Sequence, residues 1–143
     1  MSFSDQMQAF CIKEAPEKTG EIVRKVILEI GDRLVTRSPV GDAKYWKDPA
    51  PPGYTGGRFR GNWQYGYGAA PQGDYDVIDK SGALSLGRIE SGVASSQAAG
   101  LHWIANNLPY SERIEMGWSR QAPQGIIGLT ELEFPQIVEM AKR

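Results

Sequence analysis

The clearest hydrophobic pattern in the chain lies in its first third and predicts a long amphipathic helix over residues 17–35. The apolar positions recur at helical spacing and form one continuous stripe, made of Ile22, Val23, Val26, Ile27, Ile30 and Leu34. Pro16 suits the first turn, where its missing N–H removes no hydrogen bond. Because Pro39 disfavours helical backbone at Ser38, the helix should end near Arg37. We expect a shorter helix over residues 4–14 to precede it.

The period of the pattern then changes from helical to alternating. Residues 60–68 place Trp63, Tyr65 and Tyr67 on one face and small or polar side chains on the other, which is typical of a half-buried antiparallel strand. Residues 101–107 alternate in the same way and predict a second strand. We also expect a turn and strand over 110–118 and a short apolar strand over 126–129. Residues 79–99 permit a short helix, which three glycines weaken.

The chain closes on a second helical pattern. Thr130 and Glu133 have the spacing of a capping box and predict the start of a helix, in which Pro135 is tolerated close to the N-terminus. Its apolar face consists of Leu132, Ile137, Val138 and Ala141. Together the patterns predict one domain over residues 1–143 that combines a long N-terminal helix, antiparallel strands, a C-terminal helix and a long Gly/Pro-rich loop.

Glycine and proline locate that loop. The chain holds 26 of them, and 11 lie in residues 38–68, together with 7 of the 14 aromatic residues. Six of the nine residues at 49–57 are Gly or Pro, so this stretch cannot form a regular helix or strand. We therefore predict an extended loop or arm over 38–57, followed by the aromatic strand.

Composition excludes several classes of protein. Sixteen Lys and Arg against 17 Asp and Glu give a net charge of −1, without the basic excess of a protein that coats nucleic acid. No apolar run is long enough to span a bilayer, and no secretory leader is recognisable. The single cysteine, Cys11, cannot form an intramolecular disulfide. With one histidine besides, a zinc site is not expected, and we predict no metal or cofactor.

Candidate catalytic residues are few, and we predict that the protein is not an enzyme. His102 would need a partner such as Glu90, Glu112 or Glu115, and a half-buried strand histidine bound to backbone is the simpler interpretation. Cys11 is most simply a small apolar residue. On a predicted strand, Glu112 and Glu115 point to opposite faces and do not form an acid–base pair. No phosphate-binding glycine motif is present.

Arginine and aromatic residues are concentrated after the loop. Arg58 and Arg60 flank Phe59 and precede Trp63. Such a mixture can stack and clamp single-stranded nucleic acid. It is also the usual composition of the centre of a protein–protein contact, and two arginines are few for binding nucleic acid. We favour an interface.

Two sequence signatures give this interface a context. S-P-V at 38–40 and T-G-G-R-F-R-G-N-W at 55–63 resemble the first signature of bacteriophage neck and tail-completion proteins. W-I-A-N-N-L-P-Y at 103–110 and the I-E-x-G-x-S-x-Q-A-P-x-G pattern at 114–125 are similar to the second, in the same order. The resemblance covers residues 23–137. It implies a small α+β domain with its sheet on the N-terminal helix, whose copies assemble as a hexameric ring where tail joins capsid.

The resemblance therefore predicts a structural virion protein that completes the tail and joins it to the head. It implies head-closure or connector proteins and tail-tube or tail-terminator proteins as partners, genomic DNA that passes through without sequence-specific binding, and assembly in the host cytoplasm. Predicted interface or sheet-organising residues are Arg58, Phe59, Arg60, Trp63, Tyr110 and Glu115. Three alternatives stay open: a tail-terminator or head-closure ring subunit, a single-stranded nucleic-acid-binding module, and a hydrolase built on His102 and Glu115.

Overall fold

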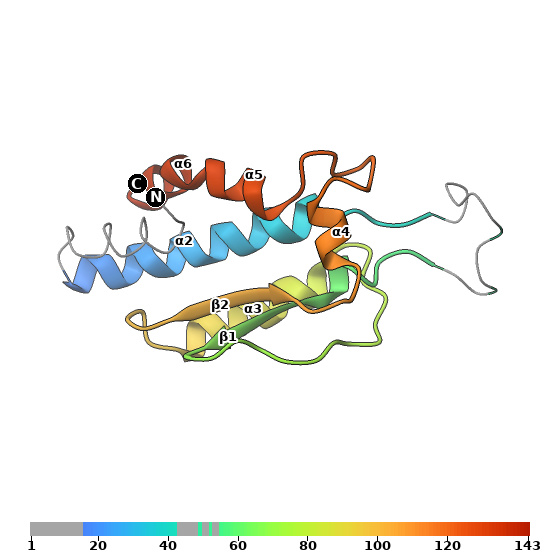
Figure 1. Cartoon of the computed structure of the whole chain (residues 1–143). Coiled ribbons are helices and arrows are strands. Elements are labelled where there is room, and N and C mark those ends of the chain that lie inside the picture. The colour runs from blue at the N-terminus through green and yellow to red at the C-terminus, as the bar shows by residue number, and fades with distance from the viewer. Residues whose placement is uncertain (1–15, 43–48, 50–51, 53–54) are drawn as a thin grey trace.

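The computed structural model describes residues 16–42, 49, 52 and 55–143 (Figure 1). The predicted helix over 4–14, Cys11 and much of the predicted loop lie outside these residues. The described chain combines helices with a small antiparallel sheet, in agreement with the predicted α+β class. Its elements are α2 (Pro16–Arg37), the 3₁₀ helix η2 (Arg60–Asn62), β1 (Trp63–Tyr67), α3 (Ala83–Ser95), β2 (His102–Asn106), α4 (Ser111–Glu115), α5 (Ile127–Leu132) and α6 (Phe134–Ala141).

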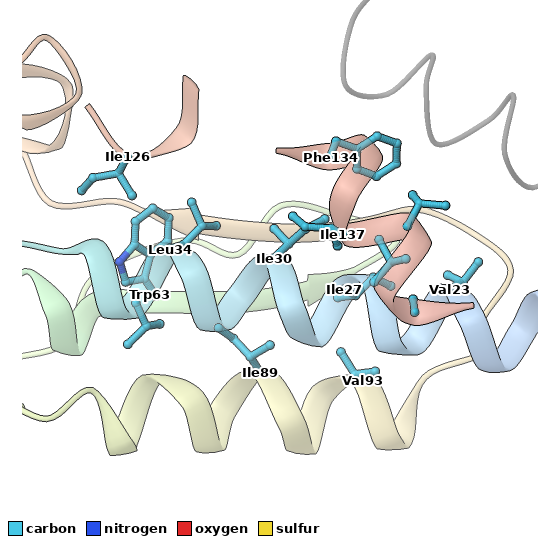
Figure 2. Packing of buried hydrophobic residues seen from close by; sticks show 14 of the residues in the cluster. Val23, Ile27, Ile30, Leu34, Trp63, Ile89, Val93, Ile126, Phe134 and Ile137 are labelled. Atoms are coloured by element: carbon cyan, nitrogen blue, oxygen red, sulfur yellow. The ribbon is translucent and has the colours of Figure 1, made fainter. Parts of the chain in front are cut away.

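Helix α2 lies at the centre of the molecule, with α5 and α6 on one side and α3 and the sheet on the other (Figure 1). The elements on both sides pack against the apolar residues of α2, so these layers share one hydrophobic core (Figure 2). Close packing on the α3 side depends on Gly31, where an added Cβ would lie 3.0 Å from Cγ2 of Ile89. The buried apolar residues of α2 are Ile22, Val23, Val26, Ile27, Ile30, Leu34 and Val35.

The sheet has two antiparallel strands, paired from Trp63 with Asn106 to Tyr67 with His102. Strand β1 starts three residues later than predicted, because residues 60–62 form η2. Strand β1 packs chiefly against α3, which in turn packs against α2. Gly92 makes this possible, since a Cβ there would lie 2.1 Å from a ring carbon of Tyr65. Ile104 of β2 also reaches α2, because its Cδ1 lies 3.7 Å from the position of an added Cβ at Gly31.

The outer face of the sheet is covered by the segment that follows β1. Nε2 of Gln64 donates to the carbonyl of Gly73 at 2.6 Å, and Nδ2 of Asn107 donates to the carbonyls of Pro71 and Gly73. Gln64 is therefore buried, although its place in the alternating pattern predicts solvent exposure.

Helix α3 settles the structure of residues 79–99, which the sequence pattern leaves ambiguous. Asp79 binds its N-terminus: Oδ2 accepts from the backbone N–H groups of Leu84 and Ser85 at 2.9 and 3.2 Å, and Oδ1 accepts from Gly82. These bonds satisfy amides that have no partner within the helix. The anchored start and the buried residues Ile89 and Val93 compensate for the glycines.

The C-terminal third is more helical than predicted. Residues 111–115 form helix α4 instead of a strand. The strand expected at 126–129 is also absent, because Ile126 is the N-cap of α5 and residues 127–129 form its first turn. The predicted capping box is wrong: Thr130 lies inside α5, where its hydroxyl donates to the carbonyl of Ile126. The expected single C-terminal helix is two helices, with Pro135 in the first turn of α6. Leu132, expected on the apolar face, is exposed.

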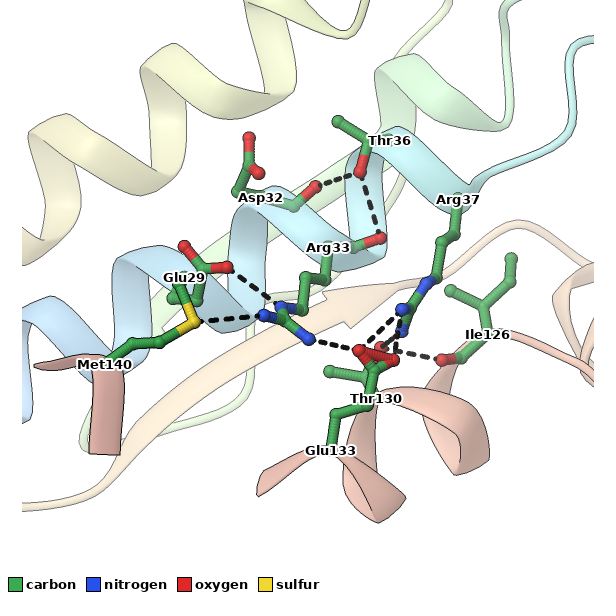
Figure 3. A network of polar contacts seen from close by, with 9 residues as sticks. All are labelled: Glu29, Asp32, Arg33, Thr36, Arg37, Ile126, Thr130, Glu133 and Met140. Carbon is green, nitrogen blue, oxygen red and sulfur yellow. Dashed lines mark hydrogen bonds and ion pairs between the residues drawn. The ribbon is translucent and has the colours of Figure 1, made fainter. Parts of the chain in front are cut away.

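Polar contacts fasten α5 and α6 to α2 (Figure 3). The carboxylate of Glu133 forms ion pairs with Arg33 and Arg37, and Arg37 also donates to the hydroxyl of Thr130 at 3.2 Å. Burial lowers the pKa of Arg33, but its hydrogen bond to Glu29 and the charges of Glu133 and Glu29 outweigh this effect, so the pKa lies above its ordinary value. Glu133 occupies the N-cap position of α6, but its side chain makes no capping hydrogen bond. Its carboxylate instead joins the C-terminal helices to α2.

Candidate interaction surface

The two signature segments meet at one end of the molecule, although 39 residues separate them in sequence. Nδ2 of Asn106 donates to the carbonyl of Phe59 at 2.9 Å, and the ring centroids of Phe59 and Tyr110 are 6.2 Å apart. Phe59 also meets Trp63 edge to face at 5.9 Å. The residues that carry the resemblance thus form a single structural unit.

Trp63 forms the buried part of this unit. Its side chain is 2% exposed, and its Nε1–H donates to the hydroxyl of Ser38 at 2.6 Å. Ser38 in turn donates to the carbonyl of Leu34 at 2.7 Å. The S-P-V and R-x-x-W parts of the first signature therefore bind each other at the end of α2. Trp63 and Phe59 belong to the chain's own core.

Arg60 closes the C-terminus of α2. Its guanidinium donates to the carbonyls of Thr36, Ser38 and Lys80 at distances of 2.6 to 3.2 Å. Carbonyls at a helix C-terminus have no intrahelical partner and carry partial negative charge, so a cation is favourable there. Arg60 thus has a stabilising role inside the fold.

Glu115 has a similar internal role. Its carboxylate accepts hydrogen bonds from the backbone N–H groups of Ile126, Ile127 and Gly128 at 2.8 to 2.9 Å. The three bonds hold the start of α5 against the end of α4. Gly125 allows this approach, because its φ is +79° and a Cβ would lie 2.4 Å from the carbonyl oxygen of Glu115. The second signature therefore fixes the loop at 117–125.

Arg58 and Tyr110 lie at the surface. Arg58 is exposed and is 3.4 Å from the carboxylate of Asp74, and Tyr110 is 36% exposed. Of the six predicted interface residues, these two and Phe59 line one surface groove. Trp63, Arg60 and Glu115 organise the structure beneath it.

This groove has a volume of about 520 Å³ and mostly apolar walls. It is lined by residues from 38–42 and 55–59, which are the two limbs of the predicted arm, and from α4 and the loop at 117–125. Its lining includes Pro39, Phe59, Ile78, Tyr110, Ile114 and Gln121. A smaller hollow of about 270 Å³ lies beside it and includes Arg37 and Arg60, whose guanidinium groups already bind partners in the chain.

The base of the arm is closed by two glycines. An added Cβ at Gly56 would lie 1.9 Å from the carbonyl oxygen of Gly41, so the two backbones are in contact. Next to them, Gly57 has φ of +113° and accepts hydrogen bonds from the N–H groups of Asp79 and Gly61. The described parts of the limbs, 38–42 and 55–59, run outward from the body side by side at the end where α4 lies (Figure 1).

His102 lies away from this surface, on β2. Its Nδ1 is 2.6 Å from the hydroxyl of Tyr65, and its Nε2 is 2.9 Å from the carbonyl of Ala98. It is a half-buried strand histidine with a backbone partner, as predicted. Within residues 16–42 and 55–143, no hydrogen bond or ion pair joins it to Glu90 or Glu115, and no group of three His, Cys, Asp or Glu is arranged to hold a metal ion.

Two organising residues were not predicted from the sequence. Asp79 anchors α3 and supports Gly57, and Gln121 binds the backbone of Val40. An acidic residue shortly before the helical pattern at 83–95 is the one local signal for Asp79, although it stands three residues ahead of the N-cap position, Gly82. Gln121 is a fixed position of the second signature, but nothing local predicts its role, because its partner lies 81 residues away.

Among the described helices, none is both long and apolar enough to cross a membrane. Comparison of the chain with protein-family models, curated proteins and solved structures found no match.

Proposed function

We propose that this protein is a structural virion protein, a ring-forming subunit at the bacteriophage head–tail junction that completes the tail and joins it to the capsid. One observation carries the proposal: the two signature segments, read separately in the sequence, converge on the base of a Gly/Pro-rich arm and frame an apolar groove there. A groove and an arm on the same end suit a protein that acts by association.

The internal roles of the signature residues support this proposal. Arg60, Trp63 and Glu115 bind backbone or buried groups of their own chain, so they fix the platform from which the arm leaves. In such a protein, the shared motif would preserve the geometry of the platform, while the arm supplies the contacts with other subunits. Near-neutral charge suits a ring through which DNA passes.

The nucleic-acid-binding alternative finds less support. It requires the aromatic strand to present stacking surfaces, but Trp63 is buried and Tyr65 packs against α3. Arg60 already donates to three carbonyls. A tail-terminator or head-closure ring uses the same kind of platform, and a phenotype is needed to separate it from tail completion.

Electron microscopy of particles made without this protein tests the proposal. Loss of a tail-completion subunit should leave filled heads and finished tails that fail to join, with joining restored by the wild-type gene. Tails of uncontrolled length would instead assign a terminator role. Normal virions that lack the protein, together with a purified chain that stays monomeric at high concentration, would refute a structural role. Binding to single-stranded DNA that weakens steeply with salt would favour the alternative.

A further inference from the structure

We propose that the apolar groove at the base of the arm receives residues 43–54 from a second copy of this chain. The proposal rests on the association of copies inferred above and names the surfaces that associate. Each copy carries both a donor segment and an acceptor groove, so copies can associate head-to-tail. Contacts of this type form a ring when the rotation between copies closes.

The groove has the chemistry of a binding surface for an apolar segment. Phe59 lies at its buried side, Ile114 and Pro39 add aliphatic surface, and Ile78 is 53% exposed among its lining residues. A branched aliphatic side chain left half in water gains free energy when a partner covers it. Arg58 and Gln121 supply polar groups at the margin of the groove.

The composition of residues 43–54 fits such a groove. Three of these twelve residues are aromatic and three are proline, with Lys44, Lys47 and Asp48 as the charged side chains. Proline-rich segments with aromatic residues bind in extended form to apolar grooves at a low cost in conformational entropy. The segment begins and ends at the groove itself, because Gly41 and Thr55 are both among the lining residues.

The direction of the limbs selects a second copy over the chain's own arm. The backbones of Gly41 and Gly56 are in contact, and Val40 is held by Gln121, so both limbs leave the body together. Their described parts, 38–42 and 55–59, point outward from the body, with the groove at their base (Figure 1). A twelve-residue segment fixed at both ends can reach at most about 20 Å from them, a reach that suits contact with an adjacent subunit.

A binding experiment tests the groove directly. The acceptor is a variant in which a short Gly/Ser linker replaces residues 43–54, and the probe is a fluorescent peptide of residues 42–55. We expect saturable binding, weakened at least tenfold by Ile78→Asp in the acceptor and unchanged by Leu84→Asp, a matched change at a 50% exposed residue of α3 outside the groove. No binding, or equal binding to both variants, overturns the proposal. Circular dichroism verifies that each acceptor is folded.

Sedimentation velocity of the full chain provides the second measurement and does not depend on the linker variant. Ile78→Asp should shift the wild-type oligomer toward monomer, and Leu84→Asp should not. If the linker variant folds, mixing it with the Ile78→Asp chain should give one-to-one pairs, because only one arm and one groove remain compatible. Failure to pair while each variant alone matches the wild type assigns the groove to its own arm and overturns the proposal.

These outcomes separate the inference from the proposed function. A wild-type ring that survives both Ile78→Asp and the linker replacement overturns arm exchange but leaves the ring subunit intact as a proposal. A wild-type chain that stays monomeric, does not bind the peptide and is missing from virions overturns both. Peptide binding by a chain that remains monomeric supports the groove and shows that further virion proteins are needed to close the ring.

Discussion

Gln121 binds the backbone of Val40 twice. The N–H of Val40 donates to Oε1 of Gln121 at 2.9 Å, and Nε2 of Gln121 donates to the carbonyl of Val40 at 2.8 Å. The side-chain amide thus offers the same donor and acceptor pair as a neighbouring strand. Because the two residues are 81 positions apart, the contact ties the first limb of the arm to the loop of the second signature.

Replacement of Gln121 by alanine should loosen the arm without unfolding the protein. Gln121 is exposed, so loss of its two bonds should lower the free energy of unfolding by only ~0.5–1 kcal/mol. The amide of Val40 should nevertheless exchange with solvent about fivefold faster, as expected for ~1 kcal/mol of local stability. Hydrogen exchange measured by mass spectrometry checks this. Equal exchange in wild type and variant would show that the clamp does not restrain the limb.

The neighbouring Gln124 provides the control for that experiment. It is exposed on the same loop, and Gln124→Ala should leave exchange at Val40 unchanged. Gln121→Glu is a stricter variant, because a carboxylate can still accept from the N–H of Val40 but faces its carbonyl oxygen without a donor. It should be at least as disruptive as alanine.

The buried bond between Trp63 and Ser38 should contribute more than the exposed clamp. Ser38→Ala leaves Nε1 of a 2%-exposed indole without an acceptor, which should cost ~1–3 kcal/mol. Trp63→Phe removes the donor, so a double-mutant cycle isolates the pair. We expect a coupling of about 1 kcal/mol or more from urea unfolding at equilibrium. Additive effects of the two changes would show that the bond contributes nothing beyond packing.

The elements that follow from local pattern are those with a long or regular signal. The apolar stripe and Pro39 locate α2 and its end, and the aromatic alternation locates β1. The errors fall where tertiary contacts override propensity. Residues 126–129 read as a strand, but the carboxylate of Glu115 binds three consecutive N–H groups there and starts α5. That carboxylate comes from another element, so no window around 126–129 contains the signal.

The candidate site shows the same division. Composition places arginine and aromatic residues at 58–67, but it does not distinguish those that face solvent from those that face the core. Arg58 lies at the surface, whereas Arg60 is drawn to the carbonyls at the end of α2. Arg60 begins η2 beside the end of α2, whereas Arg58 precedes η2 and faces Asp74. These two arginines are only two positions apart in the sequence, so composition alone cannot separate their roles.

Glu133→Gln should weaken the attachment of α5 and α6 to α2. Among the charged residues at 133–141, its neutralisation should lower the free energy of unfolding the most. The variant keeps the shape of the side chain but leaves Arg33 and Arg37, both partly buried, without their shared carboxylate. We expect a loss of ~1–2 kcal/mol, below the cost for a fully buried pair because all three side chains retain some contact with water. Urea unfolding measures it, and a loss under ~0.5 kcal/mol would contradict a joining role.

Glu139→Gln is the matched change for this test. Glu139 is highly exposed and is 3.8 Å from Lys142 at the end of the same helix, so neutralising it should cost less than ~0.5 kcal/mol of unfolding free energy.

The contribution of Arg33 to stability should not vary with pH near neutrality. The pKa of Arg33 is raised above its ordinary value, so its stabilising effect is fully present at neutral pH and would be lost only in strongly alkaline solution.

Two glycines of α3 should respond in opposite directions to the same substitution. An added Cβ at Gly87 meets no atom within 4 Å, whereas one at Gly92 would lie 2.1 Å from the ring of Tyr65. Gly87→Ala should therefore stabilise the protein by ~1 kcal/mol through helix propensity alone. Gly92→Ala gains the same propensity but must displace an aromatic ring that packs between β1 and α3, and overpacking of this kind costs ~1–3 kcal/mol. Thermal unfolding of the two variants measures the difference directly. If both substitutions raise the melting temperature, Tyr65 can move at little cost, and the close contact of the sheet with α3 does not depend on Gly92.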